Sequence, residues 1–507
     1  MILGEMLKKM VDFELDGDPT VLITSLTCDS RKVKPGSLFF ALRGSSTDGH
    51  QFIEKALEAG AAAVVLEETT CTPCKVPLVK VADGRSFMGR MAAVFNNDPT
   101  ARLPLVGITG TNGKTTTTYL IEAIMAAAGR PTAVLGTISY RFGETTIEAS
   151  HTTPESTELQ TAFRLLSEAG AQAYVMEVSS HALEQKRVDS CHFDVGIFSN
   201  LTRDHLDYHC SMDSYLEAKL RLFSELLRPS QDKSRRRAVI NMDDPYGEKI
   251  AARCACPVIT YGIKGLCDVR PANLNSSVNG INATLATPKG EFEFSSRLLG
   301  RFNLSNILAA AAAGVALDLP LQAIKSGIEN HTTVPGRMER VDNQNGITCL
   351  VDYAHTGDAL ENVLSTLKEI ATARIITVFG CGGDRDNGKR PIMGRIAASM
   401  SDLAVVTSDN PRTEEPHSIL EQIRVGITPL GYHEYTLEGL AGGFSAKGFV
   451  MLENRHEAIK LAVRLARAGD IILLAGKGHE DYQIIGTTKH HFDDREEATA
   501  AFAEMTP

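Results

Sequence analysis

The feature that most constrains the fold is a glycine-rich turn at residues 107–116, which follows an apolar run and precedes hydrophobic residues at helical spacing. Glycines let backbone N–H groups approach an anion, Lys114 supplies a positive charge, and the Thr115 hydroxyl can hold Mg²⁺. An ordinary tight turn does not need this combination, so the pattern predicts a phosphate-binding loop. The spacing departs from the usual G-x-x-x-x-G-K-[ST], because Ile108 occupies the first glycine position.

Length and charge indicate a multidomain protein that does not bind nucleic acid. The 507 residues suggest about three domains, and the net charge of -10 argues against nucleic acid or an anionic membrane surface as the main partner. The longest apolar run, residues 307–317, is too short to span a bilayer, and residues 1–18 lack the pattern of a signal peptide. We therefore expect a cytoplasmic protein whose ten cysteines are free thiols.

The order of strand-like and helical runs predicts an α/β protein of three domains. Residues 1–98 are predicted to form a small N-terminal α/β domain, with strands at 21–26, 37–41, 63–66 and 77–81. Residues 99–338 alternate strands and helices, which predicts a parallel sheet in a central P-loop ATPase domain, with a hairpin group at 268–297. Residues 339–507 restart the alternation and are predicted to form a C-terminal Rossmann-like domain.

Polar residues follow two further strand-like runs of the central domain, where ligands of such sheets bind. Glu177 ends one run and is placed to hold the Mg²⁺ of a nucleotide, although a helix-capping glutamate would fit the same sequence. His205 lies in a group of histidines and aspartates at residues 200–209. The spacing of this group does not distinguish a second metal site from a hydrogen-bonded loop.

Lys219 lies on the apolar stripe of a predicted helix, in line with residues 212, 216, 223 and 226. A buried ammonium is costly, so it should be paired or lose its proton. A neutral lysine can take up CO₂ as a carbamate, whose oxygens can bind Mg²⁺. The residues alone favour a simpler interpretation, in which the ammonium reaches solvent from the edge of the stripe.

Three other groups are weaker signals when each is taken alone. In the N-terminal domain, Ser30 and the loop at 43–50 could bind a polar ligand, but the residues favour turns. At the domain junction, Asn306, Arg337 and Asp352 could address adenine, γ-phosphate and ribose. In the last domain, residues after three strand-like runs should converge on one crevice that suits a zwitterion, and they are Gly383-Asp-Arg385, Asp409-Asn-Pro-Arg412 and Gly476-Lys-Gly-His-Glu480.

Together these motifs resemble the Mur family of peptidoglycan-building amide ligases. The phosphate loop of that family reads Thr-Gly-Thr-Asn-Gly-Lys-Thr, as residues 109–115 do here, which accounts for the unusual spacing. The resemblance covers nearly the whole chain. It implies a ligase that phosphorylates the D-Glu carboxylate of UDP-MurNAc-L-Ala-D-Glu with ATP and then joins meso-diaminopimelate to it. It also implies a monomer with small-molecule substrates and no membrane insertion, acting in cell wall biogenesis, cell shape and cell division.

The resemblance assigns individual residues to the sites of this reaction. The ATP contacts would be Gly110, Thr111, Asn112, Gly113, Lys114, Thr115, Thr116, Asn306, Arg337 and Asp352. Two Mg²⁺ ions would be held by Thr115, Glu177, His205 and a carbamylated Lys219, which reverses the simpler interpretation of that lysine. The groups expected to act in catalysis are Lys114, Lys219, His205 and Arg337.

Two substrate sites follow from the same resemblance. The UDP-linked dipeptide would be bound by Ser30, Thr152, Thr153, Ser179, Gln185 and Arg187. Diaminopimelate would be bound by Arg385, Asp409, Asn410, Pro411, Arg412, Gly476 and Glu480. Arg412 favours this amino acid over lysine, because a guanidinium can bind the distal carboxylate that lysine lacks.

Two other functions are compatible with a phosphate loop. A ligase like folylpolyglutamate synthase shares the chemistry, but the N-terminal domain and the Asp-Asn-Pro-Arg motif argue against it. A P-loop ATPase switch would hydrolyse ATP only to change shape, and it would have no use for the zwitterion-binding groups of the last domain.

Overall fold

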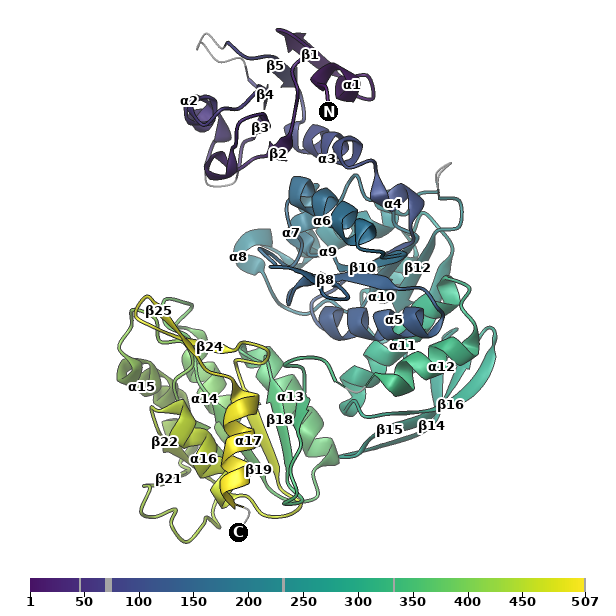
Figure 1. The fold of residues 1–507 in the computed structure, drawn as a ribbon. Coiled ribbons are helices and arrows are strands. Elements are labelled where there is room, and N and C mark those ends of the chain that lie inside the picture. Colours follow the sequence, from purple (N-terminus) through teal and green to yellow (C-terminus); the bar gives the residue numbers. More distant parts are fainter. Residues whose placement is uncertain (45–46, 69–74, 230–232, 332, 506–507) are drawn as a thin grey trace. The chain divides into compact units, whose positions relative to one another are not determined.

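The structure is a computed structural model that describes all of the chain except residues 45–46, 69–74, 230–232, 332 and 506–507 (Figure 1). The chain forms two compact units. The first comprises Met1–Ala272, Leu285–Phe292 and Ser305–Ile328, and the second comprises Asn273–Thr284, Glu293–Leu304 and Glu329–Pro507.

The first unit begins with a five-stranded sheet in the order β1-β5-β4-β3-β2. Its strands are β1 (Phe13–Asp16), β2 (Ser25–Thr27), β3 (Ser37–Ala41), β4 (Ala63–Leu66) and β5 (Leu78–Val81). The strand predicted at residues 21–26 starts late, because Leu22 and the backbone of Val21 pair with the N-terminal residues Ile2 and Leu3 instead. The short edge strand β1 has no counterpart in the prediction. Helix α1 (Leu3–Leu7), α2 (Ile53–Glu58) and α3 (Gly84–Phe95) complete this part.

The second sheet of this unit has eight strands in the order β13-β12-β11-β6-β10-β7-β8-β9. Its parallel strands are β6 (Leu105–Thr109), β7 (Thr132–Leu135), β10 (Ala173–Glu177), β11 (Val195–Phe198), β12 (Arg237–Asn241) and β13 (Val258–Tyr261). The antiparallel strands β8 (Tyr140–Phe142) and β9 (Thr145–Ile147) extend one edge. Because β6 lies between β10 and β11, the ends of these three strands are neighbours, and the predicted phosphate and metal residues follow them.

Several helices alternate with these strands along the chain or follow them. They are α5 (Lys114–Ala127), α6 (Ser156–Glu168), α7 (Ser180–Glu184), α9 (Met212–Arg221) and α11 (Gly300–Ala316). A π-helical turn, Leu222–Leu226, continues α9. A hairpin sheet of β14 (Arg270–Ser277), β15 (Gly280–Thr287) and β16 (Gly290–Ser296) confirms the prediction for residues 268–297.

The second unit contains a seven-stranded sheet in the order β17-β18-β23-β19-β20-β22-β21. Its strands are β17 (Glu339–Val341), β18 (Thr348–Asp352), β19 (Ile375–Phe379), β20 (Leu403–Val406), β21 (His433–Glu434), β22 (Gly448–Met451) and β23 (Ile471–Ala475). All pairings but that of β17 are parallel, so the loops after β18, β19, β20 and β23 meet at one edge, as predicted. The hairpin of β24 (Tyr482–Ile485) and β25 (Thr488–His491) lies beside this edge and was not predicted.

Helix α16 (Arg455–Leu465) and the C-terminal α17 (Asp494–Met505) are joined by an ion pair whose two side chains are fully buried, Arg455 with Asp494. In the described part of the chain, no helix is both long and apolar enough to cross a membrane. The described cysteines are free thiols, whereas Cys71 and Cys74 lie outside the described residues.

Candidate active site

The phosphate loop is a backbone cradle between β6 and α5, and two of its glycines are needed for its shape. Gly110 has φ +150° and Gly113 has φ +85°. An added Cβ would lie 1.9 Å from Ser199 Oγ at Gly110, and 2.3 Å from Asn306 Oδ1 at Gly113. Ile108 lies inside the buried strand β6, where no glycine is required, which explains the unusual spacing of the motif.

Asn200, which follows β11, supports this loop from outside. Its backbone oxygen accepts a hydrogen bond from Thr111 N at 2.9 Å, and its Oδ1 accepts one from Asn112 N, also at 2.9 Å. Asn306 of α11 is buried and contacts the Thr117 hydroxyl at 3.4 Å. The loop is thus held in shape by side chains from two other segments.

Glu177 lies against the start of α5 and is buried. Its Oε1 accepts hydrogen bonds from Thr115 Oγ1 at 2.9 Å and from Thr137 N at 3.0 Å. The helix-capping alternative is wrong, because Ser179 caps the following helix α7 through Ala182 N. Two oxygen donors, a carboxylate and a hydroxyl, therefore lie together at the N-terminus of the phosphate-loop helix.

Two lysines approach one carbonyl group of the loop. Lys114 Nζ and Lys219 Nζ each donate to Gly110 O at 3.0 Å, and Lys114 also donates to Thr111 O at 2.8 Å. Only 1% of Lys219 is exposed, so the interpretation in which its ammonium reaches solvent is wrong. The reason is that α9 packs with its Lys219 face inward, and Lys219 Nζ lies 4.4 Å from the ring centroid of Tyr215.

Burial lowers the pKa of Lys219 well below its ordinary value, and the nearby charge of Lys114 lowers it further. Among the side chains that the structure describes, no carboxylate lies within ion-pair distance of Lys219. A neutral amine is therefore favoured at this position.

His205 also lies near the Tyr215 ring, with ring centroids 6.2 Å apart. It is half exposed, and its Nε2 lies 3.5 Å from Asp204 Oδ2. No group of three or more potential metal-ligating side chains is found within the described residues.

Five residues predicted to bind the UDP-linked dipeptide form one hydrogen-bonded cluster beside Glu177. Thr153 Oγ1 donates to Glu177 O at 2.8 Å and accepts from Ser179 N at 3.0 Å. Arg187 donates through Nη1 to Thr153 O at 2.9 Å and through Nη2 to Gln185 Oε1 at 2.7 Å. The fifth residue, Thr152, joins through its hydroxyl, which lies 3.1 Å from that of Thr137.

Ser30 does not belong to this cluster. It begins a short 3₁₀ turn, Ser30–Lys32, in the N-terminal sheet region, and the side chain of Asp29 caps that turn. Part of the neighbouring predicted loop, residues 45–46, lies outside the described residues.

In the second unit, Asp352 and Arg337 lie close together. The Asp352 carboxylate is buried and accepts from Met338 N at 2.8 Å and Ala354 N at 2.9 Å. Burial raises the pKa of Asp352, and the charge of Arg337 opposes this shift. Arg337 Cζ also lies 5.0 Å from the ring centroid of Tyr353.

The residues predicted to bind diaminopimelate meet at the strand ends of the same sheet. Asn410 Nδ2 donates to Glu480 Oε2 at 2.9 Å, and Arg412 Nη1 donates to Gly383 O at 2.9 Å. Burial raises the pKa of Glu480, and the neighbouring Asp409 carboxylate raises it further. The site thus combines guanidinium, amide and carboxylate groups.

The side chains of two arginines approach Gly382 in this group of residues. An added Cβ there would lie 2.9 Å from Arg412 Nη1 and 3.8 Å from Arg385 Cγ. Gly476 closes the other side with φ +114°, and its added Cβ would lie 3.3 Å from Asp409 Oδ2. The two glycines therefore allow these charged side chains to pack closely against the backbone.

Comparison with known proteins gives the family. Residues 22–96 match the Mur ligase family catalytic domain, residues 108–314 the Mur ligase middle domain, and residues 336–478 the Mur ligase glutamate ligase domain. A UDP-N-acetylmuramoyl-L-alanyl-D-glutamate--2,6-diaminopimelate ligase of Geobacter metallireducens is 62% identical over 493 residues, which cover 97% of this chain and 96% of that protein. This chain belongs to the Mur ligase family.

Two further Mur ligases extend the comparison. The protein of the same name from Geobacter sulfurreducens is 61% identical, with 98% of each chain covered. A solved structure of a UDP-N-acetylmuramoyl-L-alanyl-D-glutamate--2,6-diaminopimelate ligase is 34% identical with a TM-score of 0.72, covering 100% of this chain and 99% of that one. The α/β three-domain fold is that of a Mur ligase, whereas the boundaries at 1–98, 99–338 and 339–507 stay predictions.

Sequence reasoning missed two residues of this Mur ligase site. Thr137 follows β7 and binds both carboxylate oxygens of Glu177, at 3.0 Å through N and 3.1 Å through Oγ1. Lys477 is completely buried and lies beside Asp409, Asn410 and Glu480, which were predicted to bind diaminopimelate. Thr137 follows β7 and Lys477 follows β23. Because ligands of such sheets bind at the carboxyl ends of the strands, these positions could have indicated both residues.

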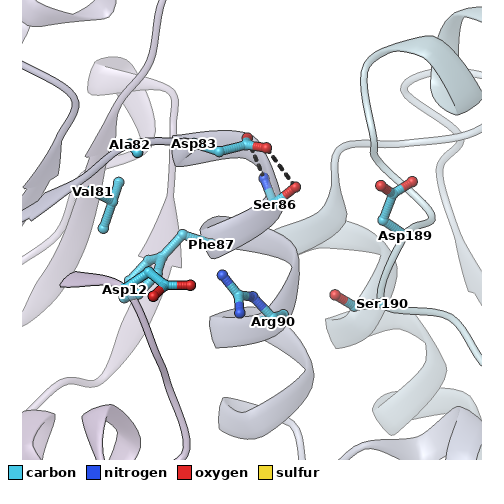
Figure 2. A pocket seen from close by; sticks show the side chains of 9 residues that line it. All are labelled: Asp12, Val81, Ala82, Asp83, Ser86, Phe87, Arg90, Asp189 and Ser190. Carbon is cyan, nitrogen blue, oxygen red and sulfur yellow. Dashed lines mark hydrogen bonds between the residues drawn. The ribbon is translucent and has the colours of Figure 1, made fainter.

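A cavity of about 440 Å³ is lined by none of the residues predicted to bind ATP, metal or substrate (Figure 2). It is lined by Asp12, Val81, Ala82, Asp83, Ser86, Phe87, Arg90, Asp189 and Ser190. Asp83 accepts from Ser86 N at 3.0 Å and pairs with Lys186 at 2.5 Å, while Asp189 pairs with Arg221 at 2.9 Å. Two of its carboxylates are thus neutralised by the protein, and we place no substrate there.

Proposed function

We propose that this protein is the ATP-dependent ligase that joins meso-diaminopimelate to the D-Glu residue of UDP-MurNAc-L-Ala-D-Glu in cytoplasmic peptidoglycan precursor synthesis. The observation that carries the proposal is the cluster in which Asn410 contacts both Arg412, at 3.4 Å, and Glu480, at 2.9 Å. A guanidinium and a carboxylate side by side suit a zwitterionic amino acid with an additional carboxylate. High identity to relatives that carry this name supports the same assignment.

ATP would be held in the first unit by the loop from Gly110 to Thr116, with Asn306 as a further contact. Thr115 Oγ1 and Glu177 Oε1 fit Mg²⁺, because they are hard oxygen donors 2.9 Å apart at a helix N-terminus. Mg²⁺ bound there would neutralise charge on the transferring phosphoryl group. Lys114 would stabilise the same charge by its own cation.

Lys219 would hold a second Mg²⁺ as a carbamate, together with His205. Only the neutral amine can add to CO₂, and burial of Lys219 favours that form. In this step the nitrogen of the neutral amine bonds to the carbon of CO₂ and releases one proton, so a neutral group becomes an anion. The negative charge would then attract the ammonium of Lys114.

The dipeptide cluster would orient the acceptor. Thr152, Thr153, Ser179, Gln185 and Arg187 surround Glu177, so a dipeptide carboxylate held there would lie next to the phosphate loop. Ser30 would contact the UDP end. On the other substrate, Arg412 with Arg385 and Asn410 would bind the distal carboxylate, and Glu480 the ammonium, with Asp409, Pro411 and Gly476 shaping the crevice.

The test is a substrate panel with the product mass as readout. Purified protein with ATP, Mg²⁺ and UDP-MurNAc-L-Ala-D-Glu is given diaminopimelate, lysine or no amine. We expect a product heavier by one diaminopimelate residue and little lysine product. Preference for lysine would refute the specificity. In a separate reaction with ATP, Mg²⁺, a folate and glutamate, addition of glutamate to the folate would favour the folylpolyglutamate alternative.

A further inference from the structure

The side chain of Lys477 is fully buried and faces three oxygen atoms. Its Nζ lies 3.3 Å from Asn410 Oδ1, 3.5 Å from Asp409 Oδ1 and 3.6 Å from Glu480 Oε2. The ammonium donates a hydrogen bond to Asn410, and its charge lies within 4 Å of both carboxylates. Lys477 is 0% exposed, so its charge acts on these neighbours and not on solvent.

Two glycines direct Lys477 inward. Gly476, at the end of β23, has φ +114°, and Gly478 has φ +55°. An added Cβ at Gly478 would lie 2.6 Å from the Cβ of Tyr353. The turn thus packs closely against the loop after β18 and carries the lysine beneath the strand ends.

The cation of Lys477 compensates a pair of carboxylates. Asp409 Oδ1 is buried and accepts no hydrogen bond in the described structure. Asp409 and burial together raise the pKa of Glu480, whereas Lys477 and the hydrogen bond from Asn410 lower it. Among the described residues, Arg455 of α16, Tyr353 after β18 and Tyr482 of β24 also interact electrostatically with Glu480.

Arg455 does not replace Lys477 in this role. Its guanidinium is paired with Asp494, and both side chains are 0% exposed. Within the described residues, Lys477 is therefore the cation that lies within 4 Å of both Asp409 and Glu480. Without it, two carboxylates would share a buried region, and one of them would take up a proton.

We propose that Lys477 is a positioning residue of the amine site, which keeps Glu480 ionised and, with Asn410, aimed at the ammonium of the incoming amino acid. This inference rests on the proposed function, in which Glu480 binds that ammonium. Lys477 itself does not touch the substrate. If the role of Lys477 were purely structural, the residue would only hold the loops together. Its loss would then lower the free energy of unfolding and raise the KM values of all three substrates alike.

The test compares Lys477→Met and Lys477→Gln in the full chain, with Lys460→Met as the matched control. Lys460 lies on α16 and pairs with Glu504 at the surface. We expect Lys477→Met to raise the KM for diaminopimelate about 10-fold or more at pH 7, with the KM values for ATP and the UDP-dipeptide within about twofold. Lys477→Gln can still donate to Asn410 but lacks the charge, so we expect an intermediate KM.

The pH dependence separates positioning from structure. In Lys477→Met the pKa of Glu480 is expected to rise, so its carboxylate ionises only as the pH increases. The ratio of variant to wild-type KM for diaminopimelate should therefore fall between pH 6.5 and pH 9, by about threefold or more. A ratio that does not depend on pH would overturn the proposal.

Other outcomes are equally decisive. Equal increases in all three KM values, or loss of the folded state in both Lys477 variants, would assign Lys477 to structure alone. If the wild-type protein releases no ADP with diaminopimelate, the proposed function fails. If the wild type is active and Lys477→Met keeps its KM, only the Lys477 inference fails.

Discussion

Lys114 and Lys219 share one acceptor, the backbone oxygen of Gly110, at 3.0 Å from each ammonium nitrogen. Lys114 starts the phosphate-loop helix, whereas Lys219 comes from α9, more than 100 residues later. Two cations on one carbonyl repel each other, so the more deeply buried Lys219 is the one whose charge is disfavoured. This contact links the phosphate loop to a buried lysine whose pKa is lowered.

Replacing Lys219 by Met should separate stability from activity. Because Met needs no desolvation of a charge, we expect the free energy of unfolding at pH 7 to stay equal or rise. The carbamate would be lost, so kcat should fall by about 100-fold or more. Denaturant unfolding and ADP release measure the two effects, and Lys460→Met serves as the control. Near-wild-type turnover would remove Lys219 from the mechanism.

The lowered pKa of Lys219 also predicts how stability depends on pH. Between the folded pKa and the ordinary value of 10.5, the unfolded chain binds more protons than the folded one, so wild-type stability should rise with pH. The penalty is full at lower pH and disappears near 10.5. We expect the difference in unfolding free energy between wild type and Lys219→Met to show this slope from pH 7 to pH 10, in CO₂-free buffer. A flat difference would contradict the shift.

Gly113→Ala should damage the phosphate loop beyond the cost of its backbone conformation. At Gly113 the new Cβ would lie 2.3 Å from Asn306 Oδ1, whereas at Gly129, with φ +71°, it would meet nothing within 4 Å. Gly129→Ala should therefore cost only about 1–2 kcal/mol of stability. We expect Gly113→Ala alone to weaken ADP binding, by about 10-fold or more in calorimetry. Equal ADP affinity in the two variants would refute this account of the loop.

Arg412→Lys tests the specificity assigned to the amine site. The guanidinium can form a fork with a carboxylate, and an ammonium cannot reproduce it. We expect kcat/KM for diaminopimelate to fall about 100-fold, with the KM for ATP within about twofold. Arg253→Lys, at an exposed pair with Glu217, is the matched control. Equal losses for both substrates would refute the assigned role.

Local patterns were the predictable part of this molecule. The phosphate loop depends on a few consecutive residues, and the parallel strands have clear apolar runs, so both could be predicted. The weakly apolar edge strand β1 could not, because its pairing with the distant strand β5 defines it. The hairpin β24–β25 has a local pairing, but its second strand is polar and exposed and so lacks an apolar run.

The same limit applies to the site. The inward face of Lys219 followed from helical spacing, but its burial depended on packing against Tyr215 and the Gly110 carbonyl, which the spacing does not contain. The position of Lys477 among Asp409, Asn410 and Glu480 joins loops about 70 residues apart in the chain. The residue types predicted the chemistry of the site, whereas the positions of these two lysines depend on tertiary contacts.

The most direct measurement is ADP release with each substrate omitted in turn. If the protein is the proposed ligase, ADP should form at an appreciable rate only when UDP-MurNAc-L-Ala-D-Glu and diaminopimelate are both present, with one ADP per ligated product. ADP release that proceeds equally fast without either substrate would contradict the account and indicate a P-loop ATPase switch.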